Sequence, residues 1–419
     1  VVIVGGGITG CAAALAAESE GLEVALIHNR PVLGGNASAE IRVHTIGIAA
    51  RAEKWISLIQ TEHWPNGADG AIDDDKKRTA NMAAAKGVKQ FLMHTLIDAR
   101  MKGNKIESVL ACATETGKIV QFNAPVFIDC TGDGWLGEMA GAESMYGRES
   151  MNDYGEGWEK HGDLWSPEKA DQRVMGTSVL WNAEQTKERH DFPEVPWAAP
   201  VAKSHEATAG EWYWEYSDND LDQVDDAEQI RDHMLRAIYG SFSNAKQQPK
   251  NATWKLKFVA HVGGKRESRR LIGDHIYSMK DATERREFDD AVVVERRDVD
   301  THYQRKETGD PLDFLSKALF YDTGGDYYLP FRTLYSKDVS NLMMAGRCFS
   351  CTHIGLAGPR VMNTCGQMGI ATGLAAVLCK KHQATPREVG QKHIAELRDL
   401  IGFDRLERIG NPSTARKHS

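Results

Sequence analysis

Three glycines near the start of the chain have the spacing that binds the pyrophosphate of a dinucleotide. Gly5, Gly7 and Gly10 follow the β-branched run 1–4 and precede the helix formers of 12–17, in a G-x-G-x-x-G pattern. In such a strand–turn–helix unit the first glycine permits a tight turn, the second lets the backbone approach phosphate, and the third allows close packing. Free amides at the helix start then face the anion; the alternative is a glycine-rich turn that binds nothing. The expected phosphate contacts are Gly5, Gly7, Ile8, Thr9 and Gly10.

The second predicted strand, 23–28, lacks the acid that normally binds a ribose. Its tip reads His28-Asn29-Arg30, with no carboxylate. The Asn29 amide can still accept a hydrogen bond from a ribose hydroxyl. This departure argues against the simplest NAD site and leaves the adenosine contacts open.

Cations and imidazoles follow several glycine turns. Arg42 and His44 lie just beyond Gly34-Gly35, where the backbone can pass close to a ribose and phosphate; a surface strand with alternating polar residues is the alternative. The run 265–270 places four cations around one acid, which indicates either an anion site or an ion-paired loop. His353 lies in the loop after the last predicted strand.

Composition indicates a globular protein of two or three domains. The 419 residues are 41% hydrophobic and 26% charged, with a formal net charge of −8, and a chain of this length buries a large core. No basic stripe tracks the sequence, so no nucleic-acid partner is expected. The longest apolar run, 369–379, is too short to span a membrane. A small-molecule substrate is therefore the expected partner, while the electron acceptor or donor and the oligomeric state are left unspecified.

The cysteines and the first residue bear on cellular location. Seven cysteines in a chain of this length do not form a disulfide scaffold. Cys348 and Cys351 form C-x-x-C, which is either a redox pair or, as we favour, two small core residues. The composition predicts a soluble protein. The sequence begins without Met, which leaves its location open between the cytoplasm and, if a targeting segment was removed, the periplasm or exterior.

Hydrophobic periodicity places the elements of the first third. Residues 51–87 predict a helical excursion with a solvated charged face. The acidic run 73–75 within it lacks the spacing of metal ligands, and no metal site is expected. A β-meander and then a buried strand follow, with strands predicted at 89–95, 105–114, 118–122 and 126–130.

The middle of the chain is rich in aromatic and acidic residues, and the opening pattern returns near its end. The aromatic run 212–216 is a packed sheet face in preference to a substrate box. Small residues in the last long helix allow close packing on a sheet or cofactor. The predicted elements are strands at 173–181, 212–216, 254–262 and 341–346, helices at 227–242, 360–380 and 386–402, and a disordered tail from Gly410.

Four motifs in this order resemble one bacterial family of FAD-dependent oxidoreductases in the glutathione-reductase-like FAD superfamily. They are 33–38, 127–134, 266–270, and 345–347 with 360–362, and the resemblance spans most of the chain. The family is more distantly similar to fumarate reductase and succinate dehydrogenase flavoproteins. The resemblance implies an α/β fold, in which an FAD-binding Rossmann-like domain with a parallel sheet and a β-meander carries an inserted mixed α+β substrate domain. The implied division is 1–145 and 331–402 for FAD binding, 146–330 for the substrate or cap domain, and 403–419 for the tail.

The resemblance implies FAD as the cofactor. Thr131 and Gly132 would close over its adenine half, and residues 34–38 would contact ribityl and phosphate oxygens. Many relatives carry an Asp after the Ala-Gly pair, where this chain has Arg347. The implied contacts beyond the first glycine turn are Asn29, Arg30, Gly34, Gly35, Asn36, Ser38, Arg42, His44, Thr131, Gly132, Gly346, Arg347, Val361 and Met362.

The catalytic candidates lie beside the motif loops. His353 is expected to act as acid or base, and four arginines are expected to clamp an oxyanion or carboxylate. The setting of His44 is similar to the Ser-His-Thr at which fumarate-reductase-like enzymes attach flavin covalently, so His44 either carries the flavin or hydrogen-bonds beside it. The four arginines are Arg42, Arg269, Arg332 and Arg360.

The leading interpretation is an FAD-dependent oxidoreductase that moves a hydride between a small polar substrate, a carbohydrate or a carboxylate, and flavin N5. A second interpretation is an aromatic hydroxylase or halogenase, because 132–134 and the Trp212 strand echo such flavoproteins. A third is a subunit that holds flavin without turnover of its own.

Overall fold

The computed structural model describes residues 1–49, 52–156, 166–210, 212–304, 310 and 312–403. The tail for which disorder was expected lies outside these residues. Within the described part of the chain, no helix combines the length and the apolar character needed to cross a bilayer.

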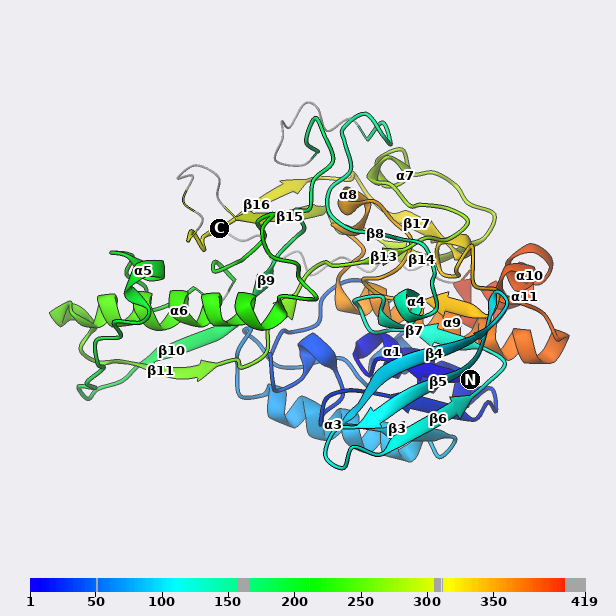
Figure 1. The fold of residues 1–419 in the computed structure, drawn as a ribbon, viewed down its shortest axis with the longest axis horizontal. Coiled ribbons are helices and arrows are strands. Elements are labelled where there is room, and N and C mark those ends of the chain that lie inside the picture. Colours follow the sequence, from blue (N-terminus) through cyan, green and yellow to red (C-terminus); the bar gives the residue numbers. More distant parts are fainter. Residues whose placement is uncertain (50–51, 157–165, 211, 305–309, 311, 404–419) are drawn as a thin grey trace.

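A five-stranded parallel sheet forms the centre of the molecule (Figure 1). Its order is β18-β7-β1-β2-β3, so the last strand of the chain lies beside strands from its first third. Ile3 of β1 pairs with Leu26 on one side and with Ile128 on the other. Three of the strands are fully buried, as parallel strands covered on both faces should be. The strands are β1 (Val2–Val4), β2 (Val24–Ile27), β3 (Val88–Phe91), β7 (Phe127–Asp129) and β18 (Leu342–Met344).

Two helices from opposite ends of the chain pack against each other in the main core. α1 (Ile8–Ser19) and α9 (Met362–His382) meet at the small residues that the sequence indicated. A Cβ added at Gly369 would lie 3.1 Å from the carbonyl carbon of Thr9, so only glycine permits this approach. Both helices begin at the carboxyl edge of the sheet.

The predicted β-meander is present as a three-stranded antiparallel sheet. The expected single strand 89–95 is wrong, because Met93 has a left-handed backbone (φ 55°) and turns the chain from the central sheet into the meander. Residues before this turn form β3. The meander strands are β4 (His94–Lys102), β5 (Lys105–Ala113) and β6 (Ile119–Asn123).

The excursion contains α2 (Glu53–Ile56) and α3 (Ala71–Ala84), but its charged face is only partly solvated. Asp74 and Arg78 are buried. The Asp74 carboxylate accepts hydrogen bonds from the backbone amides of Glu62 and His63 at 2.9 and 3.2 Å. Within the acidic run, Asp74 therefore holds the loop before α3, while Asp73 faces water.

The middle segment has an apolar cluster of its own beneath α6 (Ala227–Lys246). Figure 1 shows α6, β10 and β11 reaching away from the central sheet as an arm. The expected strand 212–216 is wrong, since only isolated bridges form there. The predicted strand 173–181 shortens to β9 and the first residue of β10. Besides α6, the first strands and helices of the middle segment are β8 (Ser144–Met145), β9 (Thr177–Ser178), β10 (Trp181–Gln185), α5 (Ala199–Ala202) and β11 (Trp254–Val259).

Short elements connect this segment back to the sheet. The surface helix expected over 386–402 is two helices, because His393 ends one and begins the next.

The division of the chain into domains stays a prediction. The remaining elements are α4 (Trp135–Met139), β12 (Gly264–Lys265), β13 (Arg270–Leu271), α7 (Met279–Thr283), β14 (Ala291–Glu295), β15 (Val299–Gln304), β16 (Ser316–Tyr321), β17 (Tyr327–Pro330), α8 (His353–Leu356), α10 (Pro386–Lys392) and α11 (Ile394–Ile401).

Candidate active site

The first glycine turn forms an open cradle at the start of α1. Gly7 is the N-cap of α1, and no side chain caps this end of the helix. A Cβ on Gly7 would meet only the Cα of Gly35, at 4.0 Å, so the backbone is exposed on the side where a phosphate would lie. The amide of Gly34 donates to the carbonyl of Gly6 at 2.8 Å. The two glycine turns thus lie side by side beneath an uncapped helix N-terminus, which attracts anions.

At the end of β2, where dinucleotide-binding proteins usually carry a ribose-binding acid, the His28 side chain hydrogen-bonds to the backbone. Nδ1 of His28 accepts the Gly6 amide at 3.0 Å, and Nε2 lies 3.1 Å from the carbonyl of Val32. Burial lowers the pKa of His28 to about 4, so the ring is neutral and structural. Beyond it, Asn29 is exposed and Arg30 is paired with Glu40.

The other two glycine-bearing strand ends meet the same edge. A Cβ on Gly132 would lie 2.5 Å from Nη2 of Arg347, and one on Gly346 would lie 2.9 Å from the Thr9 hydroxyl. Thr131 is turned back to Asp129, to which its amide donates at 2.9 Å. Gly7, Gly132 and Gly346 therefore come together at one edge of the sheet, a region that we call the crevice.

Arg347 stands in this crevice with unused hydrogen-bonding capacity. Its Nη2 lies 3.6 Å from the Asp133 carboxylate, while Nη1 is buried without a partner among the described residues. Asp133 is also bonded to Lys265 at 2.8 Å, and Asn36 donates to the Lys265 carbonyl at 3.0 Å. A guanidinium with an unpaired buried N–H beside two glycine turns fits a phosphate or a ribityl hydroxyl.

The loop that carries His44 lies at the start of α9. The amide of Asn363 donates to the carbonyl of Ile46 at 3.0 Å. The His44 ring contacts Trp64 with centroids 4.3 Å apart, and its Nδ1 is buried with no partner in the described part of the chain. Burial lowers the pKa of His44 to about 4, so the ring is neutral.

The start of α9 is the second uncapped helix N-terminus at this edge. Val361 is its N-cap and Met362 its first residue, with no capping side chain. Met362 packs on the small apolar cluster around Ile41 and Val43. Ser38, by contrast, is buried inside the turn, where its carbonyl accepts the Arg42 amide at 2.7 Å.

Next to α9 lies a buried polar compartment around His353. Nδ1 of His353 is 2.7 Å from Oε2 of Glu267, and both side chains are fully buried. Nε2 of His353 is buried and has no partner among the described residues. Burial, together with the charges of Arg270, Arg148 and Arg360, holds the pKa of His353 well below its usual value. The imidazole is neutral and keeps one nitrogen free.

Arginines line the far side of this compartment. Arg360 donates to the Asp300 carbonyl at 2.9 Å, and burial lowers the pKa of Arg360 to about 10, although it stays charged at neutral pH. Arg266 donates to Ser178 at 2.8 Å and lies over the Trp212 ring at 4.7 Å. In the described structure, nitrogens without partners remain on three of these side chains: Nη2 of Arg266, Nε of Arg297 and Nε of Arg360.

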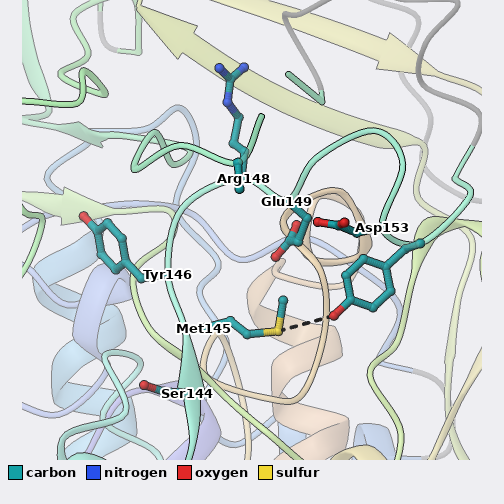
Figure 2. Close-up of a pocket in the computed structure, with 8 residues that line it drawn as sticks. Ser144, Met145, Tyr146, Arg148, Glu149 and Asp153 are labelled. Atoms are coloured by element: carbon teal, nitrogen blue, oxygen red, sulfur yellow. Dashed lines mark hydrogen bonds between the residues drawn. The ribbon is translucent and has the colours of Figure 1, made fainter. Parts of the chain in front are cut away.

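A cavity of about 540 Å³ adjoins the compartment (Figure 2). Glu149 in its wall accepts the His353 amide at 2.8 Å and the Arg270 guanidinium at 2.8 Å. The Tyr154 hydroxyl donates to the sulfur of Met145 at 4.0 Å, and Figure 2 shows Glu149 beside Asp153. A volume of this size accommodates a small polar molecule. The full lining is Ser144, Met145, Tyr146, Arg148, Glu149, Asp153, Tyr154 and Ala170.

Three of the predicted arginine clamps lie outside the compartment. Arg332 pairs with Asp289 and Asp290 near α10, and its expected role as a clamp stays a prediction. Arg269 stacks over Trp135 at 5.0 Å, beside the Gly132 turn. Arg42 donates to Asp69 at 2.7 Å and covers Phe258. Only His353 and Arg360 of the catalytic candidates share the buried compartment.

The structure adds residues that the sequence did not single out as catalytic. Glu267 and Arg266 belong to the run 265–270, which carried the signal of an anion site. Arg297 and Glu149 carried no signal, because their neighbours in the sequence do not reveal that Arg297 pairs with Asp300 or that Glu149 accepts the His353 amide. Cys348 and Cys351 are separate, buried thiols, which agrees with two core residues.

One group of described side chains has the composition of a metal site, at the other end of α9. Ligand atoms of His382, His393 and Glu396 lie within 4.8 Å of one another. The two rings are stacked at 3.8 Å with an interplanar angle of 5°. In-plane lone pairs of parallel rings do not converge on one ion, and Lys381 already pairs with Glu396 at 2.6 Å. This group does not join the site at the sheet edge.

The crevice at the sheet edge fits an extended dinucleotide with a flavin. Two uncapped helix starts, a bare glycine cradle and the unpaired Arg347 nitrogen provide anion contacts along one edge. Arg360 of the buried compartment lies two residues before the start of α9.

Comparisons with known proteins agree with this assignment. The model of the family described as FAD dependent oxidoreductase matches residues 1–401. A geranylgeranyl bacteriochlorophyll reductase-like protein from Thermoplasma acidophilum is 12% identical, with 97% of this chain and 87% of that chain covered and a TM-score of 0.41. The flavin-dependent brominase Bmp2 is also 12% identical, with 96% and 83% covered and a TM-score of 0.41.

Other similarities are confined to part of the chain. Thermovibrio ammonificans THI4 is 21% identical, and the match covers 34% of this chain and 62% of that chain with a TM-score of 0.28. No match was found among curated proteins. These scores are too low to carry an argument about activity. The family match extends over nearly the whole chain and includes every glycine turn of the crevice, so the protein belongs to the FAD dependent oxidoreductase family and FAD is its cofactor.

Proposed function

We propose that the protein moves a hydride between a small polar substrate and N5 of FAD, in the buried compartment around His353. When bound, FAD supplies the ring that accepts or donates two electrons. The observation that carries the proposal is the free Nε2 of His353, buried opposite arginines that also keep unpaired nitrogens. Buried polar groups without partners are uncommon in proteins and indicate a ligand site.

Within this proposal each side chain has a task. His353 exchanges a proton with the substrate at Nε2. Arg360 and Arg266 bind and orient a negatively charged group, since a guanidinium is a strong donor to carboxylates. Burial of the compartment excludes water, which strengthens these contacts. The cavity beside Glu149 is the chamber through which the substrate reaches His353.

The arginines favour a carboxylate-bearing substrate over a neutral carbohydrate. Nη2 of Arg266 and Nε of Arg360 would otherwise stay desolvated without compensation, at a cost of about 1–3 kcal/mol each. A hydroxy acid or a sugar acid satisfies both the arginines and His353.

Anaerobic titration of the FAD-loaded protein tests the proposal. A panel of hydroxy acids, sugar acids and neutral sugars is added while the visible flavin absorbance is followed. We expect an acid to bleach the band in the wild type and to fail in H353A and R360A, which should keep the FAD spectrum. A flavin that no member of the panel reduces, and that no small oxidant reoxidises after photoreduction, would favour a subunit without turnover. Oxygen uptake with NADPH and an aromatic compound would instead favour a hydroxylase or halogenase.

A further inference from the structure

Glu267 is placed to control the hydrogen on His353. The carboxylate is fully buried between the segment before β13 and helix α8. Its Oε2 lies 2.7 Å from Nδ1 of His353 and accepts the Met175 amide at 2.8 Å. Its Oε1 accepts from the guanidinium of Arg270. The Met175 amide and the Arg270 guanidinium both donate to this buried carboxylate, and such bonds favour its ionised form.

An ionised carboxylate can only accept hydrogen bonds, so it decides which nitrogen of the imidazole carries the proton. The hydrogen shared with Glu267 belongs to Nδ1. The ring is neutral, because the pKa of His353 lies well below its usual value. Nε2 therefore has a lone pair, and it is the atom without a partner among the described residues.

We infer that Glu267 is a positioning residue that holds His353 as the Nδ1–H tautomer, so that Nε2 takes the proton of a substrate alcohol. This inference rests on the proposed function and sets its direction as alcohol oxidation. The C–H bond of the carbinol carbon breaks and its electron pair passes as hydride to FAD. The hydroxyl proton moves to Nε2, the O–H electrons form the carbonyl bond, and the substrate loses two electrons in total.

The surroundings of His353 agree with a base that becomes charged only during the reaction. Cations on three elements disfavour a resting imidazolium. When the proton arrives, the carboxylate at 2.7 Å stabilises the imidazolium as an ion pair. The titratable and charged groups that face the ring are Glu267, Glu149, Arg148, Arg270, Arg360 and Tyr303.

Nitrogen NMR of the wild-type holoenzyme tests the tautomer without turnover. In protein labelled with ¹⁵N-histidine and assigned by comparison with H353Q, we expect the His353 signals of a protonated Nδ1 and a bare Nε2 at neutral pH. A protonated Nε2, or a resting imidazolium, overturns the inference. Because this experiment uses the wild type, it decides the question even if variants fold poorly.

The kinetics of E267Q test both the direction of the reaction, alcohol oxidation, and the positioning role of Glu267. We expect flavin reduction by the alcohol to slow by roughly 10²- to 10⁴-fold with KM little changed. The midpoint of the rising pH profile should move to lower pH, because the imidazolium loses its anionic partner. D281N is the matched control: Asp281 also pairs with a histidine, His275, at 2.8 Å, yet outside the compartment. The pH profile of flavin reduction in D281N should match that of the wild type.

Two failures can be told apart. A wild-type rate and pH profile in E267Q overturn the role of Glu267. If the expected tautomer is present while no alcohol reduces the wild-type flavin, the alcohol direction and the proposed function both fail, and the assignment of the tautomer survives on its own.

Discussion

Replacing Gly369 with alanine tests whether the close approach of α1 and α9 supports the cofactor crevice. The added Cβ would lie 3.1 Å from the carbonyl carbon of Thr9 and closer still to its oxygen. Both atoms belong to the backbone of α1, so neither can rotate away. The helix must shift, and Thr9 belongs to the predicted phosphate cradle.

Gly366 on the same helix provides the matched control. A Cβ there would meet the end of the Ile56 side chain at 3.3 Å, which can yield. Alanine favours a helix over glycine by about 1 kcal/mol at either position, so this gain cancels between the two variants. The steric cost that remains at Gly369 is about 1–3 kcal/mol. We expect G369A to be less stable than G366A by that difference.

Urea unfolding followed by tryptophan fluorescence measures the free energy of unfolding of both variants under one set of conditions. Quenching of flavin fluorescence measures their affinity for FAD. G369A should lose both stability and FAD affinity, whereas G366A should keep them. Equal unfolding midpoints in G369A and G366A would refute the argument that the backbone contact with Thr9 sets the helix spacing.

Three further outcomes are expected. R347A should weaken FAD binding roughly tenfold to a hundredfold, since a buried charged donor is lost, and equilibrium dialysis against FAD would expose an unchanged affinity. R332A should lower stability by at most about 1 kcal/mol and leave flavin reduction intact, because Arg332 only pairs with Asp289 and Asp290; a loss of turnover would restore its catalytic role. Burial raises the pKa of Glu156 from 4.5 to about 7, so the folded state holds this proton more tightly and loses stability as the pH rises from 4.5 to 7. E156Q should therefore be more stable than wild type at pH 8, by about 2 kcal/mol after allowance for partial exposure, and equal at pH 4; equal melting temperatures at pH 8 would contradict this.

The parallel sheet and the glycine turns could be predicted because their signals are local. A buried β-branched strand, a glycine turn and a helix occupy adjacent residues, and parallel strands bring their carboxyl ends to one edge. The approach of Gly7, Gly132 and Gly346 follows from that rule. The break at Met93 could not be foreseen, since nothing in its neighbours marks a left-handed backbone.

The buried ion network could not be predicted because its members are far apart in sequence. Glu267 lies 86 residues from His353, and Glu149 lies 204 residues from the amide it accepts. For the same reason the ion pair between Arg332 and Asp290 could not be foreseen, because proximity to a motif in the sequence does not reveal this partner. The charged face that includes Asp74 was expected to be solvated, yet Asp74 is buried and accepts hydrogen bonds from backbone amides 11 and 12 residues away in the sequence.

The pairing of α1 with α9 has a consequence for how the protein is made on the ribosome. β18 and α9 are translated after all the other strands of the central sheet, yet β18 pairs with β7 as the outer strand of that sheet and α9 packs on α1. Until β18 and α9 emerge, the nascent chain exposes the outer edge of β7 and the face of α1 on which Gly369 and Gly373 of α9 pack. Cofactor capture therefore waits for the completion of synthesis, and a chain that terminates before residue 341 should depend on chaperones and fail to retain FAD.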